Sequence, residues 1–245
     1  MKKVLIAILA VALVLGIAAC NNGKEDINKK SEGVLTYAEY AAAAIDSEVT
    51  VEAYVQAHQS WWDNKITVYA VDGDGGYFFY ELQCTEADAA KLVPGTKIKV
   101  KGTKAEWSGE VEISGGTFEI ESGSYIAKST DVTSLLGTED LAKKMNQFVS
   151  FKGLKIEASK IEGEDQERAF LYKWNGAGEQ GDDLYFKASV NGQTYTFVIE
   201  SYLCGKDSEV YKAVEALQIG DTVDLEGFLY WYNGAQPHIT SLIKK

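Results

Sequence analysis

The fold is decided by Pro94-Gly95-Thr96-Lys97-Ile98-Lys99-Val100-Lys101-Gly102, because this stretch recurs as Ile219-Gly220-Asp221-Thr222-Val223-Asp224-Leu225-Glu226-Gly227. In both stretches a glycine stands at the second position, apolar residues then alternate with polar ones, and a second glycine ends the alternation. Alternation with a period of two is typical of a strand with one buried face. The chain therefore contains two copies of one β-rich unit.

A second pair of stretches supports the repeat. The segment 48–55 aligns with 148–155, an offset of 100 residues, whereas Gly95 aligns with Gly220, an offset of 125 residues. The second copy therefore carries about 25 additional residues, and the polar, glycine-rich stretch between Ser159 and Asp182 is where they fall. A folded part of about 210 residues suits two domains of about 100 residues each.

Each copy predicts the same order of elements. In the first copy we expect a helix over 37–45, strands over 49–55, 66–71 and 77–82, a helix over 85–92, and strands over 97–105 and 110–119. In the second copy the corresponding ranges are 135–145, 148–155, 184–190, 194–200, 208–217, 222–229 and 237–242. Two helix starts in the first copy carry capping signals, Thr36 with Glu39 and Thr85 with Asp88.

Three strands, a helix and two strands follow one another in the OB-fold, a five-stranded Greek-key barrel. The patterns Gly95-x-x-Ile98-x-Val100-x-Gly102 and Gly220-x-x-Val223-x-Leu225-x-Gly227 resemble the fourth and fifth strands of OB domains. From about Thr36 onward, the chain resembles bacterial lipoproteins with tandem OB-fold domains of the nucleic-acid-binding type. The resemblance implies a mainly β protein with two tandem OB-fold-like five-stranded Greek-key barrels, over 35–125 and 126–245. A short helix precedes each barrel, and another helix lies between its strands three and four.

The N-terminal residues read as a targeting segment. Lys2 and Lys3 precede an apolar run over 4–14, and the small residues at 17–19 lead to Cys20. This is the pattern of a secretory signal peptide, and a cysteine directly after the small residues resembles the lipobox of bacterial lipoproteins. We expect a signal peptide over 1–19, lipidation of Cys20, and a flexible tether over 20–34. The expected location is extracytoplasmic, lipid-anchored at the cell membrane or outer surface.

Composition limits the classes of function. The chain is 46% apolar and 24% charged, a balance typical of a folded protein and not of a disordered one. Its net charge is −12 at pH 7, and loss of the two leader lysines makes the mature chain more negative still. Binding of duplex nucleic acid by counterion release needs a surplus of lysine and arginine, so the charge argues against that class.

The five tryptophans fall in particular loops. OB barrels bind ligands across strands two and three, between the loop joining strands one and two and the loop joining strands four and five. The predicted ligand-binding rings in these loops are Trp61, Trp62, Trp107, Tyr172, Trp174, Tyr230, Trp231 and Tyr232, which leaves no tryptophan for a barrel core. They could stack on sugar rings or bases, or they could close the barrel ends and join the two domains.

A row of lysines is the second candidate feature. Lys97, Lys99 and Lys101 share one face of the fourth strand of the first copy, and with Lys65 and Lys104 they could contact phosphates. The corresponding stretch of the second copy is acidic. The alternative is that the lysines form a solvated strand face.

No catalytic group, metal site or cofactor site is predicted. The two histidines, His58 and His238, stand at unrelated positions in the two copies. The stretch 72–75 has calcium-loop character but lacks the closing glutamate, since Gln83 stands at the twelfth position. Cys84 and Cys204 occupy related places, as small buried residues or as a bridge between domains.

Two functional hypotheses follow. The first is a monomeric, non-enzymatic binding or adaptor module, held at the membrane through the lipid on Cys20, whose aromatic OB faces bind an oligosaccharide, peptide or protein. The alternative is binding of single-stranded nucleic acid by the OB domains. A basic groove would favour nucleic acid, and a neutral or acidic groove would favour a sugar or protein ligand.

Overall fold

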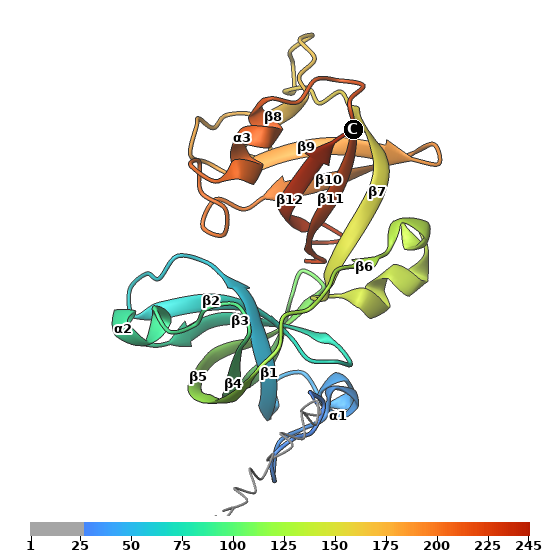
Figure 1. Ribbon diagram of the computed structural model, residues 1–245. Helices are drawn as coiled ribbons and strands as arrows, with labels where there is room; N and C mark the ends of the chain where they lie inside the picture. Colours follow the sequence, from blue (N-terminus) through green and yellow to red (C-terminus); the bar gives the residue numbers. More distant parts are fainter. Residues whose placement is uncertain (1–26) are drawn as a thin grey trace, which may run out of the picture.

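The computed structural model describes residues 27–245, so the predicted signal peptide and Cys20 lie outside the described residues. The protein is mainly β and consists of two barrels, one at each end of the molecule in Figure 1. Among residues 27–245, no helix has the length and apolar character needed to cross a bilayer.

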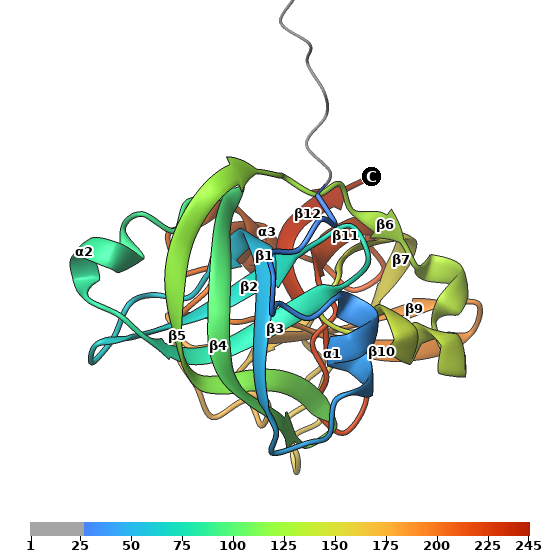
Figure 2. The same ribbon diagram turned by 90° about the horizontal axis from the view of Figure 1, so that it is seen from below.

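The first barrel is a five-stranded sheet closed on itself. It comprises β1 (Glu48–His58), β2 (Lys65–Val71), β3 (Gly76–Gln83), β4 (Thr96–Trp107) and β5 (Glu110–Ser124), in the spatial order β1-β2-β3-β5-β4. The β3–β5 pair is parallel and the other pairs are antiparallel. Helix α1 (Tyr37–Ala42) precedes β1, and α2 (Glu86–Ala89) lies between β3 and β4. Figure 2 shows the strands of this barrel curving around its axis.

The second barrel repeats these pairings. Its strands are β7 (Phe148–Glu157), β9 (Leu184–Val190), β10 (Gln193–Ile199), β11 (Thr222–Phe228) and β12 (His238–Lys244), with α3 (Glu209–Glu215) between β10 and β11. The sheet closes because β7 pairs with both β11 and β9, and the parallel pair is β10–β12. The predicted fold class, two tandem OB-fold barrels, is confirmed.

The second copy departs from the prediction in two places. Two 3-10 helices, η1 (Thr133–Leu135) and η2 (Glu139–Lys144), stand where one helix over 135–145 was expected. Gly137 between them has a φ of +79°, outside the helical region, so a continuous helix cannot form. The polar stretch after Ser159 also contains a strand, β8 (Phe170–Tyr172), paired with β9, and a short β6 (Thr130–Asp131) pairs with β7.

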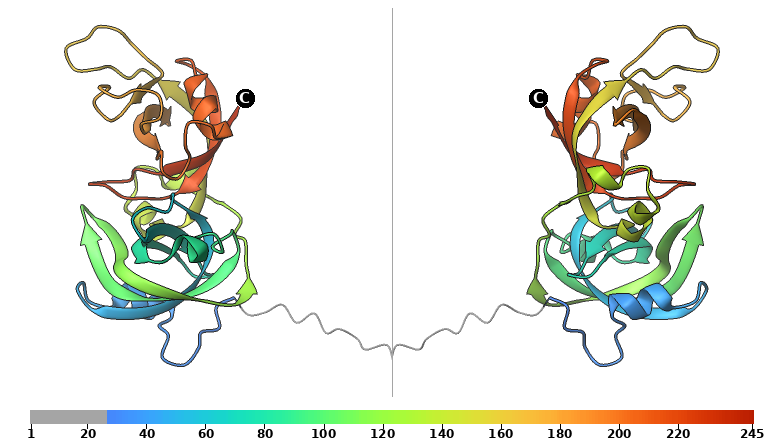
Figure 3. Two further views of the ribbon diagram at one scale, coloured as in Figure 1. Left: turned by 90° about the vertical axis from the view of Figure 1, so that its left-hand side faces the viewer. Right: turned by 90° about the vertical axis from the view of Figure 1, so that its right-hand side faces the viewer.

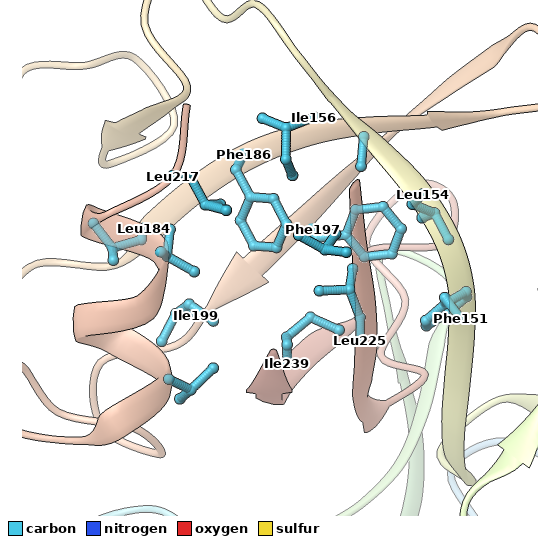
Figure 4. Close-up of a cluster of buried hydrophobic side chains, with 14 of the residues drawn as sticks. Phe151, Leu154, Ile156, Leu184, Phe186, Phe197, Ile199, Leu217, Leu225 and Ile239 are labelled. Carbon is cyan, nitrogen blue, oxygen red and sulfur yellow. The ribbon is translucent and has the colours of Figure 1, made fainter. Parts of the chain in front are cut away.

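Each barrel has its own apolar core. Figure 4 shows the core of the second barrel, where Phe151, Phe186 and Phe197 meet aliphatic residues from all five strands and α3. The first core is built in the same way and includes Ile98 and Val100 of β4. The expectation that no tryptophan serves a core was wrong, because Trp61 packs half-buried against the first core.

A third apolar cluster joins the barrels, which lie one above the other in Figure 3. Tyr69 and Phe78 of the first barrel are buried with Phe228 of the second, and the rings of Tyr69 and Phe228 stack with centroids 4.7 Å apart. A hydrogen bond of 2.7 Å joins Tyr69 Oη to His238 Nδ1. The barrels are therefore docked through buried contacts.

Glycines at the repeat motif allow β4 and β11 to bend where their pairing with the next strand shifts. The register shifts lie at Gly102 and at Gly227. A Cβ on Gly227 would overlap the backbone of His238 and lie 2.7 Å from Ile239 Cα, so only glycine fits there.

We expect Gly227→Ala to lower the free energy of unfolding by about 1–3 kcal/mol, because backbone atoms have to move to accept the methyl group. Gly205→Ala is the matched control, since the nearest atom to its Cβ would be an ordinary 3.6 Å away. Urea denaturation followed by tryptophan fluorescence measures both variants. Equal stability of the two variants would contradict the prediction.

Candidate ligand-binding cleft between the barrels

A large hollow lies between the two barrels. Its volume is about 830 Å³, within the range of small-ligand sites. Both barrels contribute to its walls, which are formed by Gln59, Phe78, Tyr80, Trp107, Glu112, Trp174, Tyr185, Glu200, Tyr230, Tyr232, Gln236 and His238. We call this hollow the interbarrel cleft.

A second hollow continues the interbarrel cleft over the first barrel. Its volume is about 440 Å³, and Gln59 and Tyr80 line both hollows. Its other walls include Trp62, Lys65, Glu81 and Tyr202. The two hollows form one groove, which we call the extended groove.

Every aromatic side chain of residues 27–245 that is more than a third exposed lines the extended groove. These side chains are Trp62, Tyr80, Trp107, Trp174, Tyr202 and Tyr232, and the most exposed of them are Trp62 at 79%, Trp174 at 75% and Tyr202 at 65%. Exposed rings scattered over a surface need no explanation, but six rings gathered along one groove indicate a binding site.

Two tight loops place rings in the cleft. Trp107 ends β4 and is followed by Ser108 and Gly109, both with positive φ, as in the two-residue turn of a β-hairpin. The loop between β11 and β12 docks on this turn, since Asn233 N donates to Ser108 O at 2.7 Å. The loops that join strands four and five in the two barrels therefore meet at the cleft.

Of the eight aromatic residues predicted from the sequence, five line the extended groove: Trp62, Trp107, Trp174, Tyr230 and Tyr232. The other three have structural contacts. Trp61 Nε1 donates to Cys84 O at 3.1 Å, and Tyr172 Oη donates to Glu215 Oε1 at 2.6 Å. Trp231 is half-buried where the barrels meet, its indole against Gly109.

The predicted lysine row is neutralised within the first barrel. Lys97 Nζ lies 2.9 Å from Glu52, and Lys99 Nζ lies 2.9 Å from Glu121. Lys101 Nζ lies 3.0 Å from Glu48, and none of the three lysines lines the extended groove. The geometry favours a cross-strand ion-pair network over a phosphate-binding face.

Two other sequence features also have structural explanations. Lys104 Nζ donates to the carbonyl groups of Tyr40, Ala41 and Ala43 at the end of α1. Asp72 Oδ1 accepts hydrogen bonds from Asp74 N and Gly75 N, both at 2.8 Å, as a turn residue does. Among the described residues, Cys84 and Cys204 are free thiols and no cluster of metal-ligating side chains occurs.

The charge of the interbarrel cleft comes from carboxylates. Burial raises the pKa of Glu112 and of Glu200 to about 7, with the neighbouring carboxylates Glu81 and Asp183 adding to the respective shifts. Burial lowers the pKa of His238 to about 3, so its ring is neutral at physiological pH. Within the part of the chain that the structure describes, no lysine or arginine lines the interbarrel cleft.

Sequence reasoning missed part of the groove. Tyr80 is the last of four consecutive aromatic residues on β3, and the alternation along a strand does not say which of the four face outward. Tyr185, Tyr202, Glu112 and Glu200 carried no signal, because their place depends on how the barrels dock.

Glu110 makes the stability of the folded protein depend on pH at the contact between the barrels. Its side chain is fully buried, its Oε2 accepts from Trp231 N at 2.8 Å, and its Oε1 has no hydrogen-bond partner in the described part of the chain. Burial raises its pKa to about 8, so the folded state binds a proton that the unfolded state has released above about pH 4.5. This contribution to stability is lost as the pH rises toward 8.

We expect Glu110→Gln, which mimics the protonated acid, to raise the free energy of unfolding near pH 8 by about 1–4 kcal/mol. Near pH 5 it should change little, because wild-type Glu110 is then protonated in the folded state. His238 titrates alike in both proteins and cancels from the difference. Urea melts at the two pH values test this, with the exposed Glu119→Gln as control, and an equal gain at both would contradict it.

No protein-family model and no curated protein matches the sequence. Solved structures that it resembles include a murine DNA-binding protein bound to double-stranded DNA, at 11% identity and a TM-score of 0.37 over 80% of this chain and 96% of that one. The Ifi202 HINa domain in complex with 20-bp double-stranded DNA has 12% identity and a TM-score of 0.35, over 81% of this chain and 98% of that one. A deletion mutant of the single-stranded DNA-binding protein from Thermus aquaticus has 12% sequence identity and a TM-score of 0.26, over 81% of this chain and 93% of that one. With TM-scores below 0.5, these likenesses say nothing about the ligand of this chain.

Proposed function

We propose that the protein is a non-enzymatic binding module whose extended groove holds an oligosaccharide. The observation that carries the proposal is the gathering of all six exposed aromatic rings of residues 27–245 along that groove. A sugar ring has C–H faces that pack on aromatic rings and hydroxyl groups that require hydrogen bonds. A groove with aromatic walls and a few polar groups meets both needs.

The polar groups between the rings suit hydroxyl ligands. Gln59 and Gln236 each offer an amide donor and acceptor, and Glu112 and Glu200 offer acceptors. Tyr80, Tyr185 and Tyr232 add phenol groups to the same walls. The interbarrel cleft can therefore exchange hydrogen bonds with a sugar without carrying positive charge.

The length of the groove favours a chain-like ligand. Trp62 and Tyr202 stand in the hollow over the first barrel, and Trp107 and Trp174 stand in the interbarrel cleft. Tyr80 and Gln59 connect the two parts. A linear oligosaccharide can contact rings in both parts at once, whereas a monosaccharide fills only one.

Single-stranded nucleic acid is the second candidate, because bases stack on exposed rings as readily as sugars do. OB barrels bind such strands with a basic groove beside the rings. Among residues 27–245, Lys65 is the lysine or arginine that lines the extended groove, and its Nζ lies 2.8 Å from Glu81. The charge of the groove therefore favours the oligosaccharide.

The location is a proposal that rests on the N-terminal sequence. The lipobox pattern ending at Cys20 supports export and lipid anchoring, which would present the groove outside the cytoplasm. We expect Cys20→Ala in the full-length chain to move the protein from the membrane fraction to the soluble fraction of the cells that express it. Retention in the membrane fraction would contradict lipid anchoring.

We expect Trp107→Ala and Trp174→Ala each to weaken oligosaccharide binding about tenfold, because each removes one stacking surface worth about 1–2 kcal/mol. Isothermal titration against a panel of linear oligosaccharides, with oligo(dT) as the nucleic acid arm, measures the effect. Ile126→Ala is the control, since this side chain is 66% exposed and lies outside the groove.

Binding of oligo(dT) that weakens with salt, without sugar binding, would overturn the oligosaccharide proposal in favour of nucleic acid. Equal affinities of wild type, Trp107→Ala and Trp174→Ala would overturn the placement of the site. Shorter products after incubation, detected by chromatography, would contradict the non-enzymatic role.

A further inference from the structure

The interbarrel cleft contains a buried carboxylate without a partner. Glu112 is 7% exposed and lines the cleft, and its carboxylate makes no hydrogen bond or ion pair with residues 27–245. Other acidic groups near the cleft have partners there, since Glu200 accepts from Leu203 N at 2.8 Å and Glu81 pairs with Lys65. An ionised carboxylate at such a depth is costly unless a positive charge or several donors meet it.

The position of Glu112 follows from the strand that carries it. Successive residues of β5 face opposite sides, so Glu110 and Glu112 project toward the second barrel while Ile113 enters the first core. Glu110 Oε2 accepts a hydrogen bond from Trp231 N. Glu112 lies two residues farther along β5, on the same face, where it lines the cleft. Glu112 therefore lies on the face of β5 that lines the cleft.

The surroundings of Glu112 suit a cation. The aromatic rings of Tyr80 and Tyr230 line the same cleft, and the Glu112 carboxylate helps to raise the pKa of both phenols. Aromatic faces attract ammonium groups, and this attraction is strongest where water is excluded. The charged groups around Glu112 are Glu81 on β3, Glu110 on β5, Glu200 after β10 and Lys65 on β2, which is bound to Glu81.

We propose that the interbarrel cleft selects sugars that carry a free amine, and that the protonated amine pairs with the Glu112 carboxylate between aromatic faces. This inference rests on the proposed oligosaccharide function and specifies its ligand class as an amino sugar. Neutral sugars can occupy the same rings, but they leave Glu112 without an ionic partner.

The test is isothermal titration with a glucosamine oligosaccharide and its N-acetylated counterpart of equal length, at a pH at which the amine is protonated. The two ligands differ only in the acetyl groups that remove the charge. We expect the amine form to bind wild-type protein at least about tenfold more tightly. Glu112→Gln should abolish this preference, whereas Glu119→Gln on the same strand should keep it.

Equal or tighter binding of the N-acetylated ligand to wild-type protein would overturn the amino-sugar inference and leave the oligosaccharide function intact. A preference that survives in Glu112→Gln would overturn the role of this carboxylate. If neither of these two ligands nor any neutral oligosaccharide of the panel binds, the oligosaccharide function itself is overturned. The comparison of ligands on wild-type protein needs no variant, so it stands even where Glu112→Gln does not fold.

Discussion

The buried contact between Tyr69 and His238 fixes one barrel on the other, and the binding groove depends on it. The phenol and the imidazole form a 2.7 Å hydrogen bond where both side chains are almost inaccessible to water. Tyr230 stacks on the same imidazole with centroids 4.2 Å apart, so the ring is held on its edge and on its face. A neutral imidazole is the form that such a site tolerates, and the lowered pKa of His238 follows from its burial.

This contact also forms part of the wall of the interbarrel cleft. Tyr230 and His238 are at once interface residues and walls of the interbarrel cleft, so the docking builds the site. Because the rings of Tyr230 and His238 are held by mutual contacts before any ligand arrives, these two walls of the cleft lose little conformational freedom on binding. Glu110 is fully buried beside the second barrel, where its Oε2 accepts from Trp231 N, and Glu112 of the same strand lines the cleft.

The sequence predicted the barrels well because strand alternation, turn glycines and helix caps are local signals. The motif at Gly95 and its repeat at Gly220 located the fourth strand of each copy, and Thr36 with Glu39 located α1. The helix expected over 135–145 was wrong because helix-forming residues there are divided by Gly137. A prediction from the average helix propensity of the segment does not detect a single residue whose positive φ interrupts the helix.

The site was less accessible to sequence reasoning than the fold. Loop positions of the tryptophans identified Trp62, Trp107 and Trp174, but nothing local distinguished them from Trp61 and Trp231, which the fold uses for packing. The lysine row could not be interpreted alone, because its partners Glu48, Glu52 and Glu121 come from two other strands.

Buried acids at the barrel contact point to a compromise between stability and binding. Glu110, Glu112 and Glu200 all have raised pKa values, so each lowers the stability of the fold as the pH rises through neutrality. Apolar residues in their places would dock the barrels without this cost. Glu110 and Glu200 at least receive backbone hydrogen bonds, from Trp231 N and Leu203 N, and so help to hold the loops. Glu112 has no such contact within the described chain, so the reason for its burial is to be sought in what enters the cleft.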